Sequence, residues 1–197
     1  MPRMTASTPL DPVSAFRAVP VLTRAKARDA CVPIDVLLGP TYTKLFYDAY
    51  IPSAAKISLR TQADAALRVV AEGAHVSHHT AVQLWGGVAP ATSRIHLTFT
   101  DQRARTRRDG IAAHRSPLPH MTARAKGLLL STPTQAFLDL ASAGTELVDL
   151  VIAGDSLVKA TRTTPEDFIR AAETWRGNRA RLARRAARLI RDRKSVV

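Results

Sequence analysis

The chain has little of what several protein classes require. Its one cysteine, Cys31, cannot form an internal disulfide, and no Cys-x-x-Cys pair is present to hold zinc or an iron–sulfur cluster. No uninterrupted run of about eighteen apolar residues occurs, and the N-terminus carries charge and proline where a signal peptide needs an apolar stretch. We therefore expect a cytosolic protein without redox chemistry or a membrane anchor.

The motifs of common enzymes are also missing. The sequence has no Gly-x-x-x-x-Gly-Lys-Ser/Thr loop, no Gly-x-Gly-x-x-Gly turn, no Gly-x-Ser-x-Gly turn and no His-Glu-x-x-His motif. Cys31 is expected to be buried where two short helices join, and Asp139 and Asp155 are expected on helix surfaces. The sequence therefore predicts a protein that is not an enzyme and that uses no cofactor.

Three of the six histidines lie within five residues: His75, His78 and His79. Because only residues three or four apart meet on one face of a helix, a tetrahedral metal site here would need ligands from distant segments. Ser77 is a good N-cap, which places the next two histidines in the first turn of a helix. We therefore interpret the histidines, including His114 and His120 in or beside a strand, as packing and capping groups and expect no metal.

The strongest compositional feature is an excess of basic residues. The chain has 29 Lys and Arg against 16 Asp and Glu, a net charge of +13. Residues 176–194 hold nine Lys or Arg and one Asp, a net +8, and residues 101–110 hold four Arg and two Asp, a net +2. Arginine donates paired hydrogen bonds to phosphate, so an anionic partner is favoured. A GC-rich genome or a solvated arginine helix would explain the same composition.

The N-terminal part predicts a small domain of its own. Residues 1–15 contain three prolines among Ser and Thr and are expected to form a flexible arm. Residues 16–55 are expected to form a winged-helix-like domain, with a helix capped by Thr23, a second helix over 33–39 and an aromatic-rich β-ribbon that stops at Pro52. Helix, turn, helix and ribbon is the order of a winged helix.

Residues 56–197 are expected to form a mixed α/β region, which makes the fold class α+β. Apolar residues at helical spacing predict a helix over 59–73. Thr132, followed by Pro133, and Thr164, which opens a capping box, predict the starts of two later helices.

A hairpin and a basic helix complete this region. Residues 94–99 alternate as a half-buried strand, and the segment after the Asp109–Gly110 turn signal is expected to pair with it antiparallel, giving a hairpin with a basic tip. The last helix is expected from about Arg179 to Arg193, with apolar residues on one face and arginines on the opposite one.

Four stretches together resemble, in their order and spacing, the AbiEi-type antitoxin family and related bacterial proteins in which the same region precedes a Vsr-like endonuclease domain. Within residues 16–197 they are "LTRAKARDACVPIDVLLGPTYTKLFYDAYIP", "VSHHTAVQLWG", "LSTPTQAFLDLA" and "AGDSLVKATRTTPEDFIRAA". The resemblance implies a degenerate winged helix followed by an α/β region. It also implies a DNA-binding repressor of its own operon that counters a nucleotidyltransferase toxin.

The resemblance gives two of these motifs a structural role. The family pattern Ser-His-x-Ser-Ala-Ala-x-Leu-x-Gly is matched at Ser77 and His78, with Thr80 and Val82 as substitutions. The pattern Thr-Pro-x-x-Thr-x-x-Asp-Leu-Ala is matched at Thr132, Pro133, Asp139, Leu140 and Ala141, with Ala136 in place of threonine. By this resemblance His78 and His79 belong to a helix N-terminus inside the fold.

Two departures from the family bear on function. The presumed recognition helix, "VPIDVLL", is apolar with one acid, Asp35, and offers no Arg, Lys, Asn or Gln to read base edges. The sequence ends in "RDRKSVV", about where longer relatives begin the nuclease domain. We therefore expect a chain that is naturally short or a fragment without the nuclease carboxylates.

These observations together predict an AbiEi-like antitoxin and transcriptional autorepressor in a toxin–antitoxin or phage-defence system. Its expected partners are DNA, bound through the phosphate backbone, and a cognate toxin; no membrane is expected. The alternatives are a protein–protein interaction module and the nuclease-less N-terminal part of a Vsr-like endonuclease. The residues expected to contact phosphates are Arg17, Arg24, Lys26, Arg28 and Lys44 in the winged unit and Arg181, Arg184, Arg188 and Arg191 in the last helix.

Overall fold

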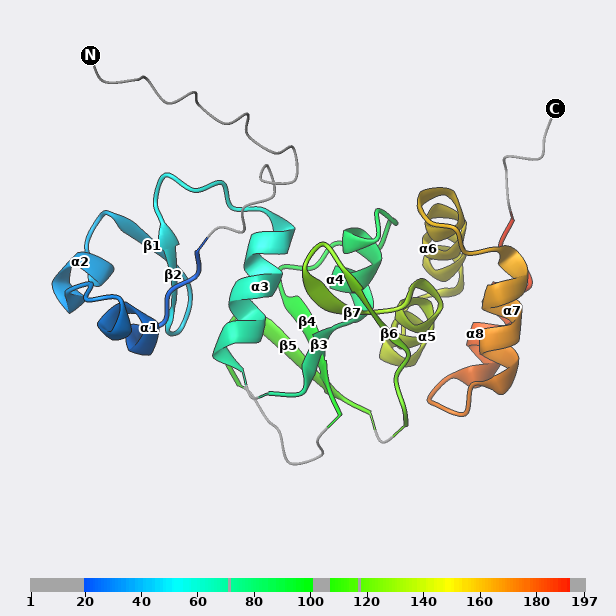
Figure 1. Cartoon of the computed structure of the whole chain (residues 1–197). Coiled ribbons are helices and arrows are strands. Elements are labelled where there is room, and N and C mark those ends of the chain that lie inside the picture. Colours follow the sequence, from blue (N-terminus) through cyan, green and yellow to red (C-terminus); the bar gives the residue numbers. More distant parts are fainter. Residues whose placement is uncertain (1–19, 71, 101–106, 117, 192–197) are drawn as a thin grey trace, which may run out of the picture.

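The computed structural model describes residues 20–70, 72–100, 107–116 and 118–191, and these form an α+β fold, as predicted. The helices are α1 (Arg24–Asp29), α2 (Ile34–Leu38), α3 (Leu59–Val69), α4 (His78–Leu84), α5 (Pro133–Ala143), α6 (Leu147–Ala160), α7 (Pro165–Thr174) and α8 (Ala180–Ala187). The strands are β1 (Tyr42–Phe46), β2 (Ala49–Pro52), β3 (Ala74–Val76), β4 (Ile95–Phe99), β5 (Ile111–Arg115), β6 (Thr122–Ala125) and β7 (Leu128–Ser131). Figure 1 shows α1, α2, β1 and β2 at one end, the larger sheet in the middle and α6 to α8 at the other end.

The N-terminal unit contains the elements that the sequence predicts. Helix α1 begins after Thr23, whose side chain accepts a hydrogen bond from the Lys26 backbone N–H at 3.2 Å, and α2 lies between Pro33 and Gly39. The aromatic segment is an antiparallel hairpin of β1 and β2. Its turn contains Asp48 at φ 63°, a left-handed conformation that aspartate tolerates better than most residues.

The central sheet has the strand order β5-β4-β3-β7-β6, and it corrects the predicted hairpin. Strand β4 pairs with β5 in parallel, with Ile95 beside Ile111, and its other edge pairs antiparallel with β3. The Asp109–Gly110 signal forms a turn at the start of β5: the Asp109 carboxylate accepts the Gly110 N–H at 2.9 Å. It therefore does not join two adjacent antiparallel strands.

Burial of β4 also differs from the expectation. All five of its residues are buried, whereas the alternating pattern predicted a half-buried strand. The strand lies inside the sheet, between β3 and β5, and contacts α3 and α4. A central strand covered in this way is buried at polar positions too.

Helices α5 to α8 pack together beside the sheet. The Phe137 ring of α5 meets the Phe168 ring of α7 edge-on at 5.3 Å, and both side chains are fully buried. The capping box at α7 is present as predicted: the Thr164 side chain accepts the Asp167 N–H, and the Asp167 carboxylate accepts the Thr164 N–H at 3.0 Å. Within the described residues, none of the helices is long and apolar enough to cross a bilayer.

Helix α8 is shorter than predicted and ends at Ala187. Beyond it, the Ile190 side chain packs against Gly154 of α6, and the Arg191 backbone N–H donates to the Asp155 carboxylate at 2.8 Å. These contacts hold Ile190 and Arg191 against α6. The predicted helix is therefore wrong from Arg188 to Arg191, and residues 192 and 193 lie outside the described range.

Candidate functional site

An exposed aromatic ring surrounded by cations marks the tip of the hairpin. Tyr47 is 60% exposed, in the turn between β1 and β2. The cationic groups of Arg24, Lys44 and Arg108 lie 5.9, 5.8 and 5.2 Å from its ring centroid. We call Arg24, Lys44, Tyr47 and Arg108 the wing cluster. Cations at this distance are attracted to the electron-rich face of the ring.

Three segments hold the wing cluster together. The Arg108 guanidinium donates to the Tyr47 carbonyl oxygen at 2.9 Å, which ties the start of β5 to the hairpin. The Arg24 backbone N–H donates to the Asp48 carboxylate at 2.9 Å, and the Arg24 guanidinium lies 4.0 Å from the same carboxylate. Both of these side chains are partly exposed, so that ion pair contributes little stability.

More arginines adjoin the wing cluster. Arg94 and Arg107 are exposed and, with Arg108, line a hollow of about 500 Å³ at the edge of the sheet. Asp109 contributes one carboxylate to the same hollow. Arg107 and Arg108 were not among the predicted binding residues, because nothing in the sequence indicated that Arg108 would contact the hairpin.

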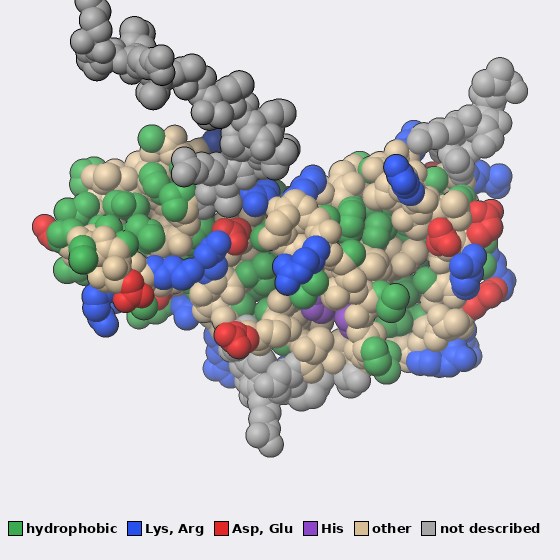
Figure 2. Space-filling view, in the orientation of Figure 1, with side chains coloured by type: hydrophobic (Ala, Val, Ile, Leu, Met, Phe, Trp, Pro, Cys, Tyr) green, Lys and Arg blue, Asp and Glu red, His purple; other side chains and the backbone are tan. Residues whose placement is uncertain are grey.

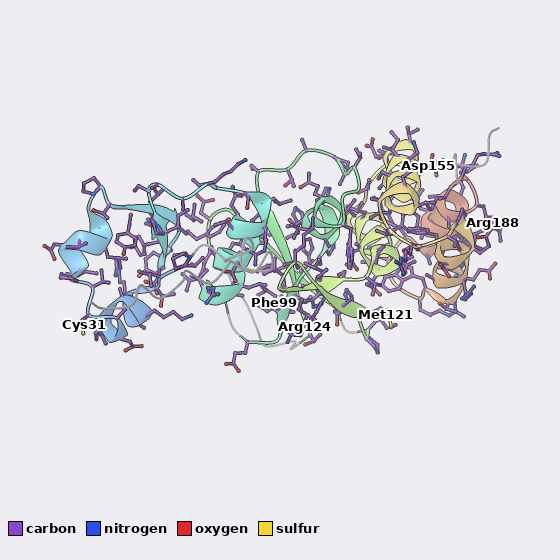
Figure 3. The ribbon with its side chains drawn as sticks, turned by 45° about the horizontal axis from the view of Figure 1, so that its top comes forward. Cys31, Phe99, Met121, Arg124, Asp155 and Arg188 are labelled. Atoms are coloured by element: carbon purple, nitrogen blue, oxygen red, sulfur yellow. The ribbon has the colours of Figure 1, made fainter. Side chains whose placement is uncertain are left out.

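The second predicted group of arginines lies at the other end of the molecule. Figure 3 labels Cys31 in the N-terminal unit and Arg188 among the C-terminal helices, far from each other. Arg181 and Arg188 are exposed and line a hollow of about 450 Å³ together with Arg185, which was not among the predicted residues. The two predicted groups therefore form two separate surfaces.

Not every predicted arginine is placed equally well for an external contact. The Arg184 guanidinium donates to the carbonyl oxygens of Ala172 and Trp175 at 3.2 and 3.3 Å, so it satisfies the C-terminal end of α7. Arg191 lies beyond α8. Lys26 and Arg28 are exposed on α1, as expected, and Arg17 lies outside the described residues. The face in Figure 2 carries Lys and Arg along its length, interspersed with Asp and Glu.

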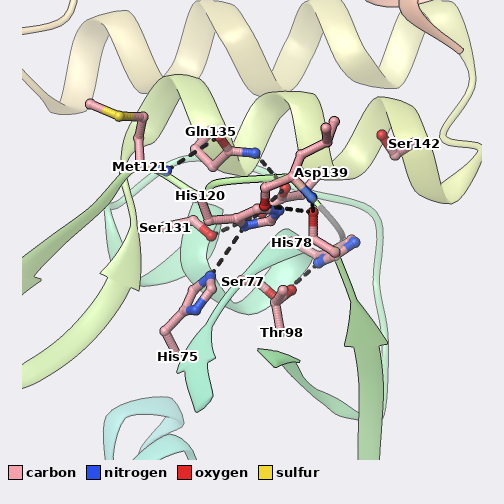
Figure 4. Close-up of polar contacts among 12 residues, drawn as sticks. His75, Ser77, His78, Thr98, His120, Met121, Ser131, Gln135, Asp139 and Ser142 are labelled. Atoms are coloured by element: carbon pink, nitrogen blue, oxygen red, sulfur yellow. Dashed lines mark hydrogen bonds and ion pairs between the residues drawn. The ribbon is translucent and has the colours of Figure 1, made fainter. Parts of the chain in front are cut away.

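The second feature of the chain is a gathering of all its histidines in one region. Those six residues come from β3, the start of α4, β4, β5 and the segment before β6: His75, His78, His79, His96, His114 and His120. They form two groups. The first contains His78, His79, His96 and His114, and the second contains His75 and His120 near Asp139, which Figure 4 shows.

In the first group, the His96 Nδ1 lies 3.0 Å from the His114 Nε2. The His78 and His114 rings are stacked with centroids 3.6 Å apart, and the His79 ring lies 4.6 Å from that of His96. One nitrogen from each of His78, His96 and His114 falls within 4.8 Å of the others. Three imidazoles from three different elements thus converge.

The second group centres on a buried carboxylate. The His75 Nε2 lies 3.3 Å from the His120 Nδ1, which lies 3.8 Å from the Asp139 carboxylate. The same carboxylate accepts hydrogen bonds from the Ser131 hydroxyl and the Gln135 amide, each at 2.9 Å. Asp139 is 2% exposed, so the expectation of a surface role on its helix is wrong, and burial raises its pKa.

Burial keeps the imidazoles neutral. It lowers the pKa of His75 and of His114 to about 4 and that of His96 to about 3, and it holds the pKa of His78 well below its ordinary value. The neighbouring histidines lower these pKa values further, because a second positive charge nearby disfavours protonation. At neutral pH these four side chains carry nitrogen lone pairs and no charge.

A cavity of about 380 Å³ opens beside the histidines. His78, His114 and His120 form part of one wall. Trp175 and Arg176, from the end of α7, form part of the other. Small molecules and exchangeable ligands therefore have a route to the imidazoles.

Comparison with known proteins bears on the fold. No family model and no curated protein matches the chain. Among solved structures, it is similar to the RV2827C protein from Mycobacterium tuberculosis, with a TM-score of 0.55 and 16% sequence identity. The match covers 89% of this chain and 74% of that chain. The α+β arrangement described above is thus shared with a crystal structure over most of the chain.

Of two local expectations at these sites, the N-cap position of Ser77 is confirmed without its side-chain hydrogen bond, and the burial of Cys31 is wrong. Ser77 precedes α4 as predicted, yet its hydroxyl makes no cap; it lies 2.8 Å from the His78 Nδ1 and accepts a hydrogen bond from Thr98. Cys31 is exposed, because the joint between α1 and α2 places it in a left-handed turn at φ 53° with its side chain in solvent.

The convergence of His96 and His114 was missed for a topological reason. Residue pairs in the parallel register place Thr98 beside His114, so His96 and His114 are diagonal neighbours on adjacent strands. No register was predicted from sequence for this pair of strands, so these two side chains were not placed relative to each other. The polar residues spaced two apart in β4, His96 and Thr98, were the signal available.

Proposed function

We propose that the chain binds duplex DNA through the phosphate backbone, with the wing cluster as its contact surface. In the finer form of the proposal it acts in the cytoplasm as an AbiEi-like antitoxin and autorepressor, without catalytic activity of its own. The observation that carries it is the exposed Tyr47 ring with three cations around it, at the tip of a hairpin in a winged-helix-like unit. Each phosphate that a cation neutralises releases counterions and adds affinity.

The side chains favour contacts to the backbone over contacts to bases. Helix α2, at the place of a recognition helix, presents Ile34, Val36 and Leu38 to solvent at 53%, 39% and 56% exposure. None of these can form the paired hydrogen bonds that identify a base in the major groove. Discrimination between sequences would then come from the shape and stiffness of the duplex, which set the cost of fitting DNA to this surface.

The salt dependence of DNA affinity tests the proposal. Lys44→Ala, Arg94→Ala and Arg107→Ala together remove one exposed cation beside Tyr47 and two that line the adjoining hollow. We expect the slope of log affinity against log salt to become shallower by about 0.9 for each phosphate that no longer has a cation beside it. Fluorescence anisotropy with a labelled duplex measures this slope.

The matched control removes the same charge from the other end, with Arg181→Ala, Arg185→Ala and Arg188→Ala. Under the proposal this variant keeps a slope closer to that of the unchanged chain. An equal or larger change of slope in the control would assign the DNA contact to α8. If the chain without substitutions has no affinity for duplex DNA at low salt, the proposal of DNA binding is rejected.

The exposed apolar side chains of α2 favour a protein partner as a second function. Three apolar side chains in solvent on one short helix are typical of a surface that another protein covers. If the chain is an antitoxin, as proposed, this partner is the toxin that the neighbouring gene encodes. We expect Val36→Asp to abolish co-purification with that toxin while leaving DNA affinity unchanged; co-purification that survives would exclude α2 as the contact.

A further inference from the structure

The strongest unexplained feature of the molecule is the group formed by His78, His96 and His114. We propose that these three side chains bind one Zn²⁺ ion, with the fourth coordination position open toward the cavity. No metal was expected from the sequence, because the spacing of the histidines along the chain does not show that distant ones meet.

The spacing of the nitrogens suits this ion. Two imidazole nitrogens bound to zinc at tetrahedral angles lie about 3.3 Å apart, given the Zn–N bond length of about 2.0 Å. The His96 Nδ1 and the His114 Nε2 are 3.0 Å apart, and all three ligand nitrogens lie within 4.8 Å of one another. Because the His78 and His114 rings are stacked, ion binding would require these two rings to tilt apart.

The outer hydrogen bonds hold two of the ligands in place. The His78 Nδ1 faces the Ser77 hydroxyl at 2.8 Å, which leaves its other nitrogen for a metal. The His96 Nε2 faces the Thr92 hydroxyl at 3.3 Å, which leaves Nδ1. Metal-binding histidines in proteins commonly use their second nitrogen in this way, and such partners fix the direction of the lone pair.

The chemistry of the donors selects the class of ion. Neutral imidazoles bind zinc and its neighbours in the first transition series, whereas magnesium and calcium prefer oxygen. Three protein ligands beside an open cavity are the arrangement in which a fourth position holds water or another small ligand. His79 lies next to the group, and its Nδ1 is buried without a hydrogen-bond partner among the described residues.

The ligands come from three elements that already contact one another through backbone and side-chain hydrogen bonds. They come from the start of α4, from β4 and from β5, and β5 is an edge strand whose one neighbour in the sheet is β4. The start of β5 also meets the hairpin, through the bond from Arg108 to Tyr47. A bound ion would therefore fasten the edge of the sheet on which the hairpin rests.

Metal titration of the full chain without a polyhistidine tag tests the inference. We expect about one equivalent of Zn²⁺ to bind after equilibrium dialysis, with a rise in the unfolding temperature, and Co²⁺ to give the visible absorption of a tetrahedral site. His114→Gln should lower zinc affinity by more than the roughly 100-fold that loss of an outer hydrogen bond costs. His75→Gln, which alters a histidine outside the three, should leave affinity unchanged.

The outcomes can be distinguished from those of the DNA-binding test, because none of these metal-binding measurements involves DNA. Absence of zinc binding at micromolar concentration, or equal binding by the unchanged chain and a folded His114→Gln variant, would overturn the site. Loss of binding in His75→Gln but not in His114→Gln would overturn the choice of ligands. If His114→Gln does not fold, His96→Gln provides the same comparison.

Discussion

At the scale of single residues, the polar interior of this protein depends on neutral side chains. His75 is 1% exposed in β3 and meets His120, which in turn lies near the buried Asp139 carboxylate. An imidazolium at that position would lose its hydration without gaining a full counter-charge. His75, which was predicted from sequence to be a packing or capping group, is therefore kept neutral by burial, and the stability of the fold depends on pH.

The pKa of His75 gives a prediction for acid stability. Its folded pKa of about 4 lies below the ordinary value of 6.5, so the unfolded chain binds a proton more readily and stability falls as pH drops from about 6.5 toward 4. His75→Gln should remove about 2 kcal/mol of the loss between pH 7 and pH 4.5. Urea unfolding with a chelator present measures this.

The exposed substitution Lys159→Gln serves as the control and should show the same pH dependence as the unchanged chain. A His75→Gln variant whose stability falls as steeply as that of the control would mean that His75 is not kept neutral by the fold.

At the scale of elements, the starts of helices were more predictable than strand pairings. Thr23, Thr132 and Thr164 all precede helices as predicted, because capping depends on a few adjacent residues. The short strands β3, β6 and β7 were missed, and the pairing of β4 with β5 was wrong, because strand pairing depends on segments far apart in sequence. The histidine group depends on that pairing, so local sequence patterns could not predict it.

The contact of α6 with Ile190, in the segment after α8, gives a prediction at this scale. A Cβ added at Gly154 would lie 2.3 Å from the Ile190 Cδ1, so Gly154→Ala forces that side chain to move. We expect a loss of about 1–3 kcal/mol in the free energy of unfolding, as for other overpacked cores.

The partner variant separates crowding from other causes. Adding Ile190→Ala removes the atoms in conflict, so the double variant should be less destabilised than the sum of the two single ones. Strict additivity in denaturant unfolding would show that Gly154 and Ile190 do not conflict, and that Gly154 tolerates a side chain.

At the scale of the whole molecule, the fold separates two basic surfaces that the sequence alone did not place. The wing cluster lies at the N-terminal end and the α8 arginines at the opposite end (Figure 1), with the histidines and their cavity between them. Net charge indicated the chemistry of a partner, but it could not say how many surfaces carry that charge. The α+β class could be predicted from helix and strand patterns, whereas the sites required the topology.

The exposed Cys31, at the joint of α1 and α2, has a consequence for handling the protein. As the one thiol in the sequence it gives a single attachment point for a maleimide dye. In air, the same thiol allows two copies to become covalently linked tip to tip through an intermolecular disulfide, which a reducing agent reverses.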